Sequence, residues 1–486
     1  MTPHYADDSV QLYAGDCLDV LRELPDASVD AVVTDPPAGI GFMGRDWDHH
    51  KGGREQWIAW LAEVMGEALR VIKPGGHALV WAMPRTSHWT ATALEDAGWE
   101  IRDCITHLFG SGFPKSLDVS KAIDRAAPRV GMFDAFAEHF RDRRVASGYS
   151  QKDVAKHFPS KTGGLTGCAW NWENGANVPT PDQWTILAPM LGLSGEWQPL
   201  IERIEAERAV VGNGKSGAAS VAFIRDSAGE FDVTAPATDA ARLWQGFGTA
   251  LKPASEHWWL ARRPLSGTVA ATVLEYGTGA LNIDASRVGS DERVNQPART
   301  LGNGVNMSGG AAQSNREATV AAGRWPPNVV LDGAAADELD TQSGTLTSGK
   351  MRAGIVPKGE RNTYGKDAAS GYETSETYGD SGGASRFFPV FKYAPKAGSI
   401  ERPRSEDIAH PTVKPLDLMR WLVKLVTPPG GTILEPFAGS GTTCEAAVIE
   451  GFKCIAIERD ETYLPLIVAR LSKPIQVALD FDGEAS

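Results

Sequence analysis

The first hundred residues alternate short apolar runs with longer amphipathic stretches. Residues 30–34 form an apolar run with β-branched side chains, typical of a central strand, and residues 77–82 and 100–108 repeat the pattern. Residues 56–71 place apolar side chains at helical spacing, which predicts a helix that packs on the sheet. This alternation predicts an α/β fold with a doubly wound, mostly parallel Rossmann-like sheet.

The strand at residues 30–34 runs into Asp35-Pro36-Pro37-Ala38. The two prolines fix φ and remove two backbone donors, and a residue before proline is held extended. Asp35 therefore lies at the carboxyl end of the strand, where open α/β sheets bind ligands. Its carboxylate and the Pro36 carbonyl offer adjacent acceptors, which suit an exocyclic amino group with two N–H donors. A strand followed by a proline-rich turn is the alternative interpretation of this motif alone.

A second motif, rich in glycine, lies near the C-terminus. Residues 432–434 predict a strand, and a turn into a helix follows, with the sequence Glu435-Pro436-Phe437-Ala438-Gly439-Ser440-Gly441-Thr442. Glycines allow the backbone to approach a ligand closely. The strand at residues 452–458 ends in Glu458, and an acid at that place in a βαβ unit bonds ribose hydroxyls. A dinucleotide-binding fold is the alternative, but the loop lacks the Gly-x-Gly-x-x-Gly spacing.

Taken together, the two motifs resemble those of the amino-methylating DNA methyltransferases, which use S-adenosylmethionine. The catalytic motif precedes the cofactor motif, which is the family's β-type order. The resemblance implies that Asp35, Pro36, Pro37 and Ala38 form the catalytic loop. It implies cofactor binding by Glu435, Phe437, Gly439, Gly441, Thr442 and Glu458. It also implies that Thr412 and Lys414, before a helix N-terminus, hold the cofactor's carboxylate, for which the local positive charge is suited.

Two positions leave alternatives open. Asp16 ends the strand predicted from Val10 onward, where the resemblance implies a contact with the cofactor adenine, and a helix N-cap is the equal alternative. Ala38 stands where the resembled family has an aromatic residue that stacks on the flipped base. Because such stacking contributes roughly 1–3 kcal/mol, either another ring substitutes or the base is bound weakly. Phe42 and Trp47 are the nearest in sequence.

The choice of substrate also leaves alternatives. In the resembled family an Asp at the position of Asp35 favours adenine N6, with cytosine N4 as the alternative. The target atom is inaccessible in a duplex, so the base must flip out of the stack. Because Ala38 departs from the family pattern, a DNA-binding regulator with weakened catalysis is a further alternative, and methylation of RNA or of a protein glutamine is another.

The middle of the chain follows a helical pattern. Helices are predicted at residues 133–146, 148–158, 166–173 and 181–191, with a Ser150–Asp153 capping box. The spacing resembles the helix-turn-helix of Cro/repressor-type proteins, whose third helix enters the major groove. A local excess of basic residues over residues 110–161 favours DNA binding. A purely structural helical insertion is the alternative.

These patterns predict seven successive regions. They are the catalytic half of a methyltransferase domain (1–128), a helix-turn-helix insertion (129–195), a linker (196–242), the return strand of the sheet (243–275), a partly flexible target-recognition region (276–390), the cofactor-binding half (391–475) and a tail (476–486). In the resembled fold the insertion would fall in a hairpin between the last two strands, and hairpin tips tolerate insertions.

The composition of the chain limits the classes of partner that the protein is expected to bind. The 486 residues carry a net charge of −13, so binding of double-stranded DNA requires basic residues gathered on one face. The five cysteines have no metal-ligand spacing, which predicts reduced thiols, no metal site and a cytoplasmic protein. No signal peptide or membrane-length apolar stretch is recognisable, so no membrane partner is expected. A homodimer and a cognate restriction nuclease stay open as partners.

Overall fold

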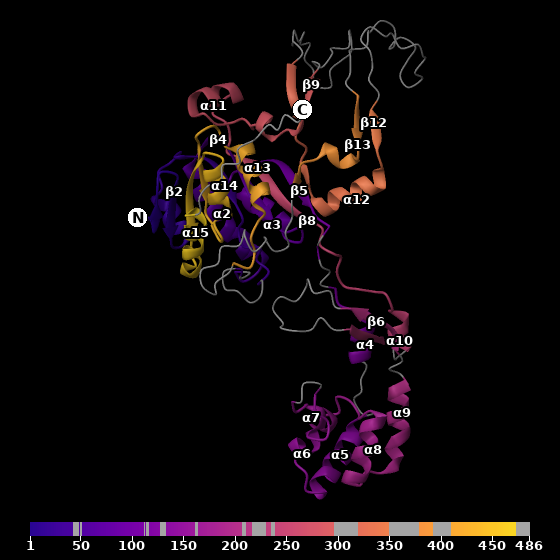
Figure 1. Cartoon of the computed structure of the whole chain (residues 1–486). Helices are drawn as coiled ribbons and strands as arrows, with labels where there is room; N and C mark the ends of the chain where they lie inside the picture. The colour runs from indigo at the N-terminus through magenta and orange to yellow at the C-terminus, as the bar shows by residue number, and fades with distance from the viewer. Residues whose placement is uncertain are drawn as a thin grey trace. The chain divides into compact units, whose positions relative to one another are not determined.

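The chain divides into two units that interleave in sequence. The computed structural model describes residues 1–41, 48, 51–110, 112, 116–126, 133–160, 164–206, 210–215, 230–234, 239–295, 319–348, 379–391 and 410–472. The first unit combines Met1–Gly112 with Ala254–Ser486, and the second spans Phe113–Pro253. The cartoon in Figure 1 labels the elements of both units.

A ten-stranded sheet forms the centre of the first unit. Its strand order is β1 (Tyr5–Ala6), β2 (Val10–Ala14), β16 (Lys453–Glu458), β15 (Thr432–Glu435), β3 (Val29–Thr34), β4 (Ile72–Ala82), β8 (Ser255–Arg262), β5 (Glu100–Leu108), β11 (Val329–Asp332) and β14 (Val390–Phe391). The neighbours from β2 to β4 are parallel, whereas β8 runs antiparallel to both β4 and β5. The predicted fold class, a mostly parallel sheet with an antiparallel strand, is confirmed.

Helices cover both faces of this sheet. One core joins it to α13 (Leu416–Val426), α14 (Thr442–Ile449) and α15 (Leu464–Leu471), and the other joins it to α1 (Cys17–Glu23), α2 (Arg54–Val71) and α3 (Ser87–Asp96). Strand β3 lies between the two cores, so all six of its residues are buried. Burial on both faces explains its continuous apolar pattern.

The connections reverse direction beside β3. From β15 the chain crosses through α14 to β16 on one side, and from β3 it crosses through α2 to β4 on the other. Strands β15 and β3 are therefore hydrogen-bonded neighbours, with Ile433 opposite Ala31 and Leu434 opposite Val32. The crevice at the carboxyl ends of strands at such a reversal is the usual ligand site of open α/β sheets.

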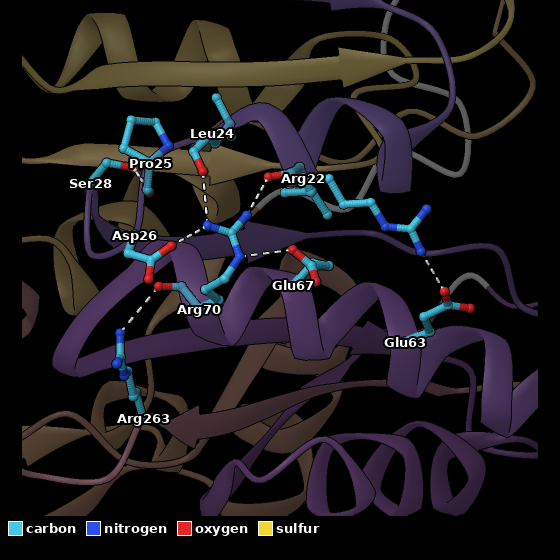
Figure 2. A network of polar contacts seen from close by, with 10 residues as sticks. Arg22, Leu24, Pro25, Asp26, Ser28, Glu63, Glu67, Arg70 and Arg263 are labelled. Carbon is cyan, nitrogen blue, oxygen red and sulfur yellow. Dashed lines mark hydrogen bonds and ion pairs between the residues drawn. The ribbon is translucent and has the colours of Figure 1, made fainter.

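Arg70, at the end of α2, ties together the opposite, amino-terminal edge of the sheet (Figure 2). Its guanidinium donates to the carbonyls of Leu24 at 2.9 Å and Leu21 at 2.7 Å, and contacts Asp26 and Glu67. Arg263, just after β8, donates to the Arg70 carbonyl at 3.3 Å. These bonds connect the ends of α1, α2 and β8.

Two features of the first unit differ from the sequence prediction. The strand predicted at residues 77–82 begins earlier, at Ile72 of β4, and the register of β4 with β3 shifts between Val29 and Ala31. The sheet also continues into the predicted target-recognition region through β11 and β14. These strands are four and two residues long, too short for periodicity to reveal them.

The rest of the region from 263 to 391 holds shorter elements. They are α11 (Val269–Tyr276), β9 (Val288–Asn295), β10 (Thr319–Arg324), α12 (Gly333–Ser343), β12 (Leu346–Ser348), β13 (Asp380–Gly382) and the 3₁₀ turns Asp284–Ser286 and Ala384–Phe387. The sequence predicts a partly flexible region at 276–390. Residues 296–318 and 349–378 of that region lie outside the described residues.

The second unit is mainly helical. It contains α4 (Val119–Ala126), α5 (Asp134–Ala146), α6 (Gln151–Ala155), α7 (Cys168–Glu173), α8 (Pro181–Leu191), α9 (Gln198–Ala206) and α10 (Asp239–Leu243), with strands β6 (Val210–Lys215) and β7 (Glu230–Thr234). Helices α5 to α9 share an apolar core that includes Phe136, Phe140 and Trp172. The unit lies in sequence between β5 and β8, which are antiparallel neighbours in the first unit.

The predicted linker at residues 196–242 is therefore corrected. It contains α9, the β6–β7 pair and most of α10. Ile201 and Ile204 of α9 are buried in the helical core. Their i, i+3 spacing is a helical signal, but the neighbouring Gly/Ser-rich stretch obscured it.

Candidate active site

Asp35 lies directly after β3, at the carboxyl edge of the sheet. Its Oδ2 atom accepts a hydrogen bond from the Lys414 ammonium at 2.6 Å. Burial raises the pKa of the Asp35 carboxyl, the Lys414 and His410 charges lower it, and the Glu256 carboxylate raises it. The carboxylate is thus partly withdrawn from water beside one cation.

The loop after Asp35 is fixed by its neighbours. The Ala38 carbonyl accepts a bond from the Thr86 hydroxyl at 3.3 Å, and the Gly39 amide donates to the buried Asp48 carboxylate at 2.8 Å. Gly39 has a φ of 70°, and a Cβ there would lie 2.5 Å from the Trp57 ring. The glycine is therefore required for both its backbone conformation and its packing.

Glu435, at the end of β15, links the two predicted motifs. Its buried carboxylate accepts bonds from the Thr34 hydroxyl, from the Phe437 amide at 3.0 Å and from the Thr443 hydroxyl at 2.6 Å. Burial raises the pKa of Glu435 to about 8. Because both of its oxygens are engaged by the chain itself, Glu435 acts in this structure as a positioning residue for the glycine-rich loop.

The glycine-rich loop is anchored to Glu458 at the end of β16. The Glu458 carboxylate accepts from the Gly439 amide and from the Asp460 amide, each at 2.7 Å. Burial raises the pKa of Glu458 to about 7. Gly439 and Gly441 have φ values of 54° and 75°, a conformation that favours glycine. The Glu458 carboxylate therefore fixes the position of the glycine-rich loop at the carboxyl edge of the sheet.

The segment before α13 brings the third group of predicted residues to this edge. The His410 Nδ1 atom lies 2.6 Å from the Thr412 carbonyl, and the Tyr463 ring packs edge-on against the imidazole at 4.5 Å. The same imidazole lies beside Gly439, where a Cβ would be 3.4 Å away. Thr412 thus lies near the glycine-rich loop, but Lys414 contacts Asp35 on the catalytic side.

The remaining predicted cofactor residues hold local contacts. Asp16 caps α1 by accepting from the Leu18 amide at 3.0 Å, as the structural alternative predicts, and it ends the strand beside β16. The Phe437 ring packs against Trp60 at 5.7 Å between centroids. The Thr442 hydroxyl lies 3.0 Å from that of Ser440.

Two predicted site residues lie outside the described residues, and two residues at the site were not predicted from the sequence. Phe42 and Trp47, predicted to supply the missing ring, lie outside the described residues. Trp81 and Glu256, at the ends of β4 and β8, were not predicted. Trp81 ends the strand next to β3, and that position was the available signal, since ligands bind at the carboxyl ends of neighbouring strands.

Within the residues that the structure covers, no set of three His, Cys, Asp or Glu side chains could hold a metal. Among the described helices, none combines the length and apolarity needed to cross a bilayer. All five cysteines are free thiols, and the sulfurs of Cys444 and Cys454 lie 3.8 Å apart in the core.

The Asp35 loop and the glycine-rich loop thus lie at the same edge of the sheet, after neighbouring strands. The chain belongs to the DNA methylase family of N6 and N4 methyltransferases, whose sequence profile matches residues 29–185 and 323–469. The profile covers Asp35, the glycine-rich loop and most of the helical insertion.

Curated relatives match in shorter segments. The chain is 30% identical over 112 residues to the type II methyltransferase M.BamHI of Bacillus amyloliquefaciens, covering 23% of this chain and 26% of that protein. It is 37% identical over 89 residues to M.ScaI of Streptomyces caespitosus, covering 18% and 28%. The matched segments thus span about a quarter of the length of these relatives.

Solved structures match over most of the chain at low similarity. The PvuII DNA methyltransferase (cytosine-N4-specific) aligns with a TM-score of 0.39 and 11% identity, covering 100% of this chain and 91% of that one. The M1.HpyAVI–SAM complex aligns with a TM-score of 0.34 and 12% identity, covering 96% and 100%.

Proposed function

We propose that this protein methylates an exocyclic amino group of a base in double-stranded DNA, with S-adenosylmethionine as the methyl donor. Adenine N6 is the proposed target atom. One observation carries the proposal: the Asp35 loop and the glycine-rich loop end neighbouring strands at the reversal point of the sheet. Family membership supports the same assignment.

The residues around the glycine-rich loop fit the cofactor. Glu458 has carboxylate lone pairs beyond its two amide bonds that suit ribose hydroxyls. Helices α13 and α14 begin without a side-chain cap, so their first N–H groups suit a carboxylate. When bound, the cofactor supplies a methyl group on a positively charged sulfur.

On the substrate side, Asp35 and Pro36 hold the amino group. The carboxylate and the Pro36 carbonyl accept its two N–H bonds, which favours a pyramidal nitrogen with its lone pair directed away from both acceptors. Alignment of that lone pair supplies much of the rate enhancement. After the transfer the nitrogen is cationic and loses one proton. The raised pKa of Asp35 suits its carboxylate to accept that proton.

The helical unit supports a finer proposal, that α6 and α7 form a DNA-reading helix-turn-helix. The predicted Ser150–Asp153 capping box is present. Glu173 of α7 is buried and accepts bonds from Arg144 and Gln151, which fixes α7 against α5 and α6. On the outer side of α7, Trp170 is 58% exposed. Residues 156–167 separate the helices, however, whereas the motif uses a turn of three or four residues.

The test uses DNA from a host without methyltransferases and a cofactor that carries a radioactive methyl group. We expect label in duplex DNA, N6-methyladenine on sequencing of modified bases, and no label with Asp35→Ala. N4-methylcytosine would establish the cytosine alternative. Label in RNA or protein but not in DNA would contradict the proposal, as would cofactor and DNA binding without transfer, which would favour the regulator.

The homodimer and the cognate restriction nuclease remain predictions. Size-exclusion chromatography with light scattering tests the homodimer, and co-purification from the native host tests a cognate restriction nuclease. For the helix-turn-helix, deletion of residues 131–193 should preserve cofactor binding and change DNA affinity or site choice. Unchanged methylation sites and efficiency after that deletion would show that the insertion is structural.

A further inference from the structure

A cation lies between a carboxylate and an aromatic ring at the catalytic edge. The Lys414 Nζ atom is 2.6 Å from Asp35 Oδ2 and 4.0 Å from the centroid of the Trp81 ring. Asp35 directly follows β3 and Trp81 lies near the end of the neighbouring β4, so the two side chains come from adjacent positions at the carboxyl edge of the sheet. Lys414 reaches them from the segment before α13.

The Trp81 ring is held in one orientation. Its indole N–H donates to Glu256 at 3.1 Å, and Trp81 faces Trp258 across the β4–β8 pair. The ring packs against the apolar core on the α13 side, but it is only partly buried. The Lys414 ammonium lies over one face of the ring, so a ligand group that displaced the ammonium from Asp35 would meet that face.

The ammonium occupies the place that the amino group of a flipped base requires. Both groups present N–H donors to a carboxylate, and both fit against the electron-rich face of a ring. A base whose amino nitrogen replaced Nζ at Asp35 would extend its own ring system along Trp81. The aromatic residue absent at Ala38 would then be replaced from a different strand.

We propose that Trp81 is the stacking ring for the flipped base and that Lys414 holds the base's place until it enters. This inference rests on the proposed function, because it names how that substrate is captured. Lys414 has a physical reason to be there in the free protein: the Asp35 side chain is only 25% exposed, and a carboxylate largely removed from water is destabilising without a partner. On base entry its flexible side chain withdraws, and the N–H donors of the base replace it at Asp35.

The test of the ring compares two variants of Trp81 by steady-state kinetics on duplex DNA. Trp81→Leu keeps apolar bulk without a ring and should raise KM for DNA roughly 10- to 100-fold, the range of base–aromatic stacking. Trp81→Phe keeps a ring and should recover most of that loss. Cofactor affinity, measured by calorimetry, should change in neither variant.

A matched control comes from Trp89, a half-buried tryptophan of α3 that packs against Trp57 in the other core. Trp89→Leu should leave KM for DNA unchanged, which separates loss of stacking from general loss of an indole. Melting temperatures of all variants verify folding. Equal KM values for wild type and Trp81→Leu would overturn the inference.

The test of Lys414 distinguishes two roles. If the ammonium competes with the base, Lys414→Met should lower KM for DNA and leave cofactor affinity unchanged, because the competent state is then more populated. If Lys414 instead binds the cofactor's carboxylate, the same variant should weaken cofactor binding, and that result would overturn the place-holding role. A wild type that binds cofactor but methylates nothing would contradict the proposed function itself.

Discussion

The two edges of the central sheet hold charged side chains in opposite states. At the amino edge, the Arg70 guanidinium lies near the surface, and its hydrogen bond with Asp26 raises its pKa, so the charged form is favoured (Figure 2). At the carboxyl edge, burial raises the pKa values of Asp35, Glu435 and Glu458, so the charged form is disfavoured. The charged form of Arg70 is thus favoured at the amino edge, whereas the charged forms of the three acids are disfavoured at the carboxyl edge.

This difference follows from the topology. At the amino edge the Leu21 and Leu24 carbonyls lie at the end of α1, and the Arg70 guanidinium donates to both, in addition to the bond from the Leu24 amide to the Leu21 carbonyl. At the carboxyl edge the acids end strands beside a crevice, with hydrogen bonds from amides and hydroxyls in place of water. We therefore expect changes at the amino edge to alter stability and changes at the carboxyl edge to alter chemistry.

The largest effect is expected at Asp35. Asp35→Ala removes the carboxylate that accepts from the amino group, and we expect methyl transfer to fall by at least about 10²-fold. The variant should still fold, but its melting temperature should fall because Lys414 loses its ion-pair partner. Radioactive methyl transfer and thermal unfolding measure the two effects. If Asp35→Ala retained methyl transfer, another residue would have to accept the hydrogen bond from the amino group.

Glu435 should show the next largest effect, as a dependence of stability on pH. Its pKa is raised from 4.5 to about 8, so the folded protein binds a proton that the unfolded chain has released, and this contribution to stability is lost as pH rises through that window. Glu435→Gln has no charge to bury. Its stability relative to wild type should rise from pH 5 to pH 8, on the order of 1 kcal/mol per pH unit.

Denaturant titrations at several pH values measure this difference in the free energy of unfolding. Glu63 offers a matched control, because it is an exposed acid on α2 at the other edge. Glu63→Gln should show no comparable trend. A constant difference between wild type and Glu435→Gln across this range would mean that Glu435 is ionised in the folded protein.

At Glu458 the expected effect is on cofactor binding. Hydrogen bonds to a charged group contribute about 1.5–3 kcal/mol, so Glu458→Ala should weaken cofactor affinity roughly 10- to 100-fold. Ribose hydroxyls favour the ionised acid, whose pKa is about 7 in the free protein. Cofactor affinity should therefore rise with pH towards neutrality and level off above it. Calorimetry measures both effects, and unchanged affinity in Glu458→Ala would contradict the cofactor site.

The carboxyl edge was predictable from the sequence where its signals are local. Paired prolines after an apolar run marked Asp35, and glycine spacing with an acid at the next strand end marked Gly439 and Glu458. The contacts that bring these distant segments together could not be predicted from the sequence. Lys414 and Asp35 are 379 residues apart in the chain, and neither residue alone indicates the other.

Other features were not predicted because tryptophan and glutamate each occur both in structural positions and in ligand-binding positions. Trp81 in an apolar run is typical of core packing, and only its register beside β3 places it near Asp35. Glu435 in a cofactor motif favours a ligand contact, but Thr34 and Thr443, from separate elements, engage its oxygens. Strand β8 lies between β4 and β5 because pairing between distant segments decides strand order.

The smallest effects are expected at the amino edge, where Arg70 and Arg22 can be compared. Arg70 bonds two backbone carbonyls and its side chain is 30% exposed, whereas Arg22 contacts Glu63 with both side chains more than half exposed. Arg70→Ala removes the side-chain donor from both carbonyls, although the Leu21 carbonyl keeps the Leu24 amide, and should cost about 1–2 kcal/mol of unfolding free energy. Arg22→Ala breaks only a solvated pair and should cost less than about 1 kcal/mol.

Methyl transfer per folded molecule should be unchanged in both variants, because the amino edge and the Asp35 loop lie at opposite ends of the strands. Chemical denaturation at pH 7 with parallel activity assays measures both quantities. Equal losses of stability in the two variants would mean that the carbonyl bonds contribute nothing beyond the ion pairs. A loss of activity in folded Arg70→Ala would show that the two edges are coupled through α2, because that helix begins close to the loop that carries Asp35 and ends at Arg70 and Val71.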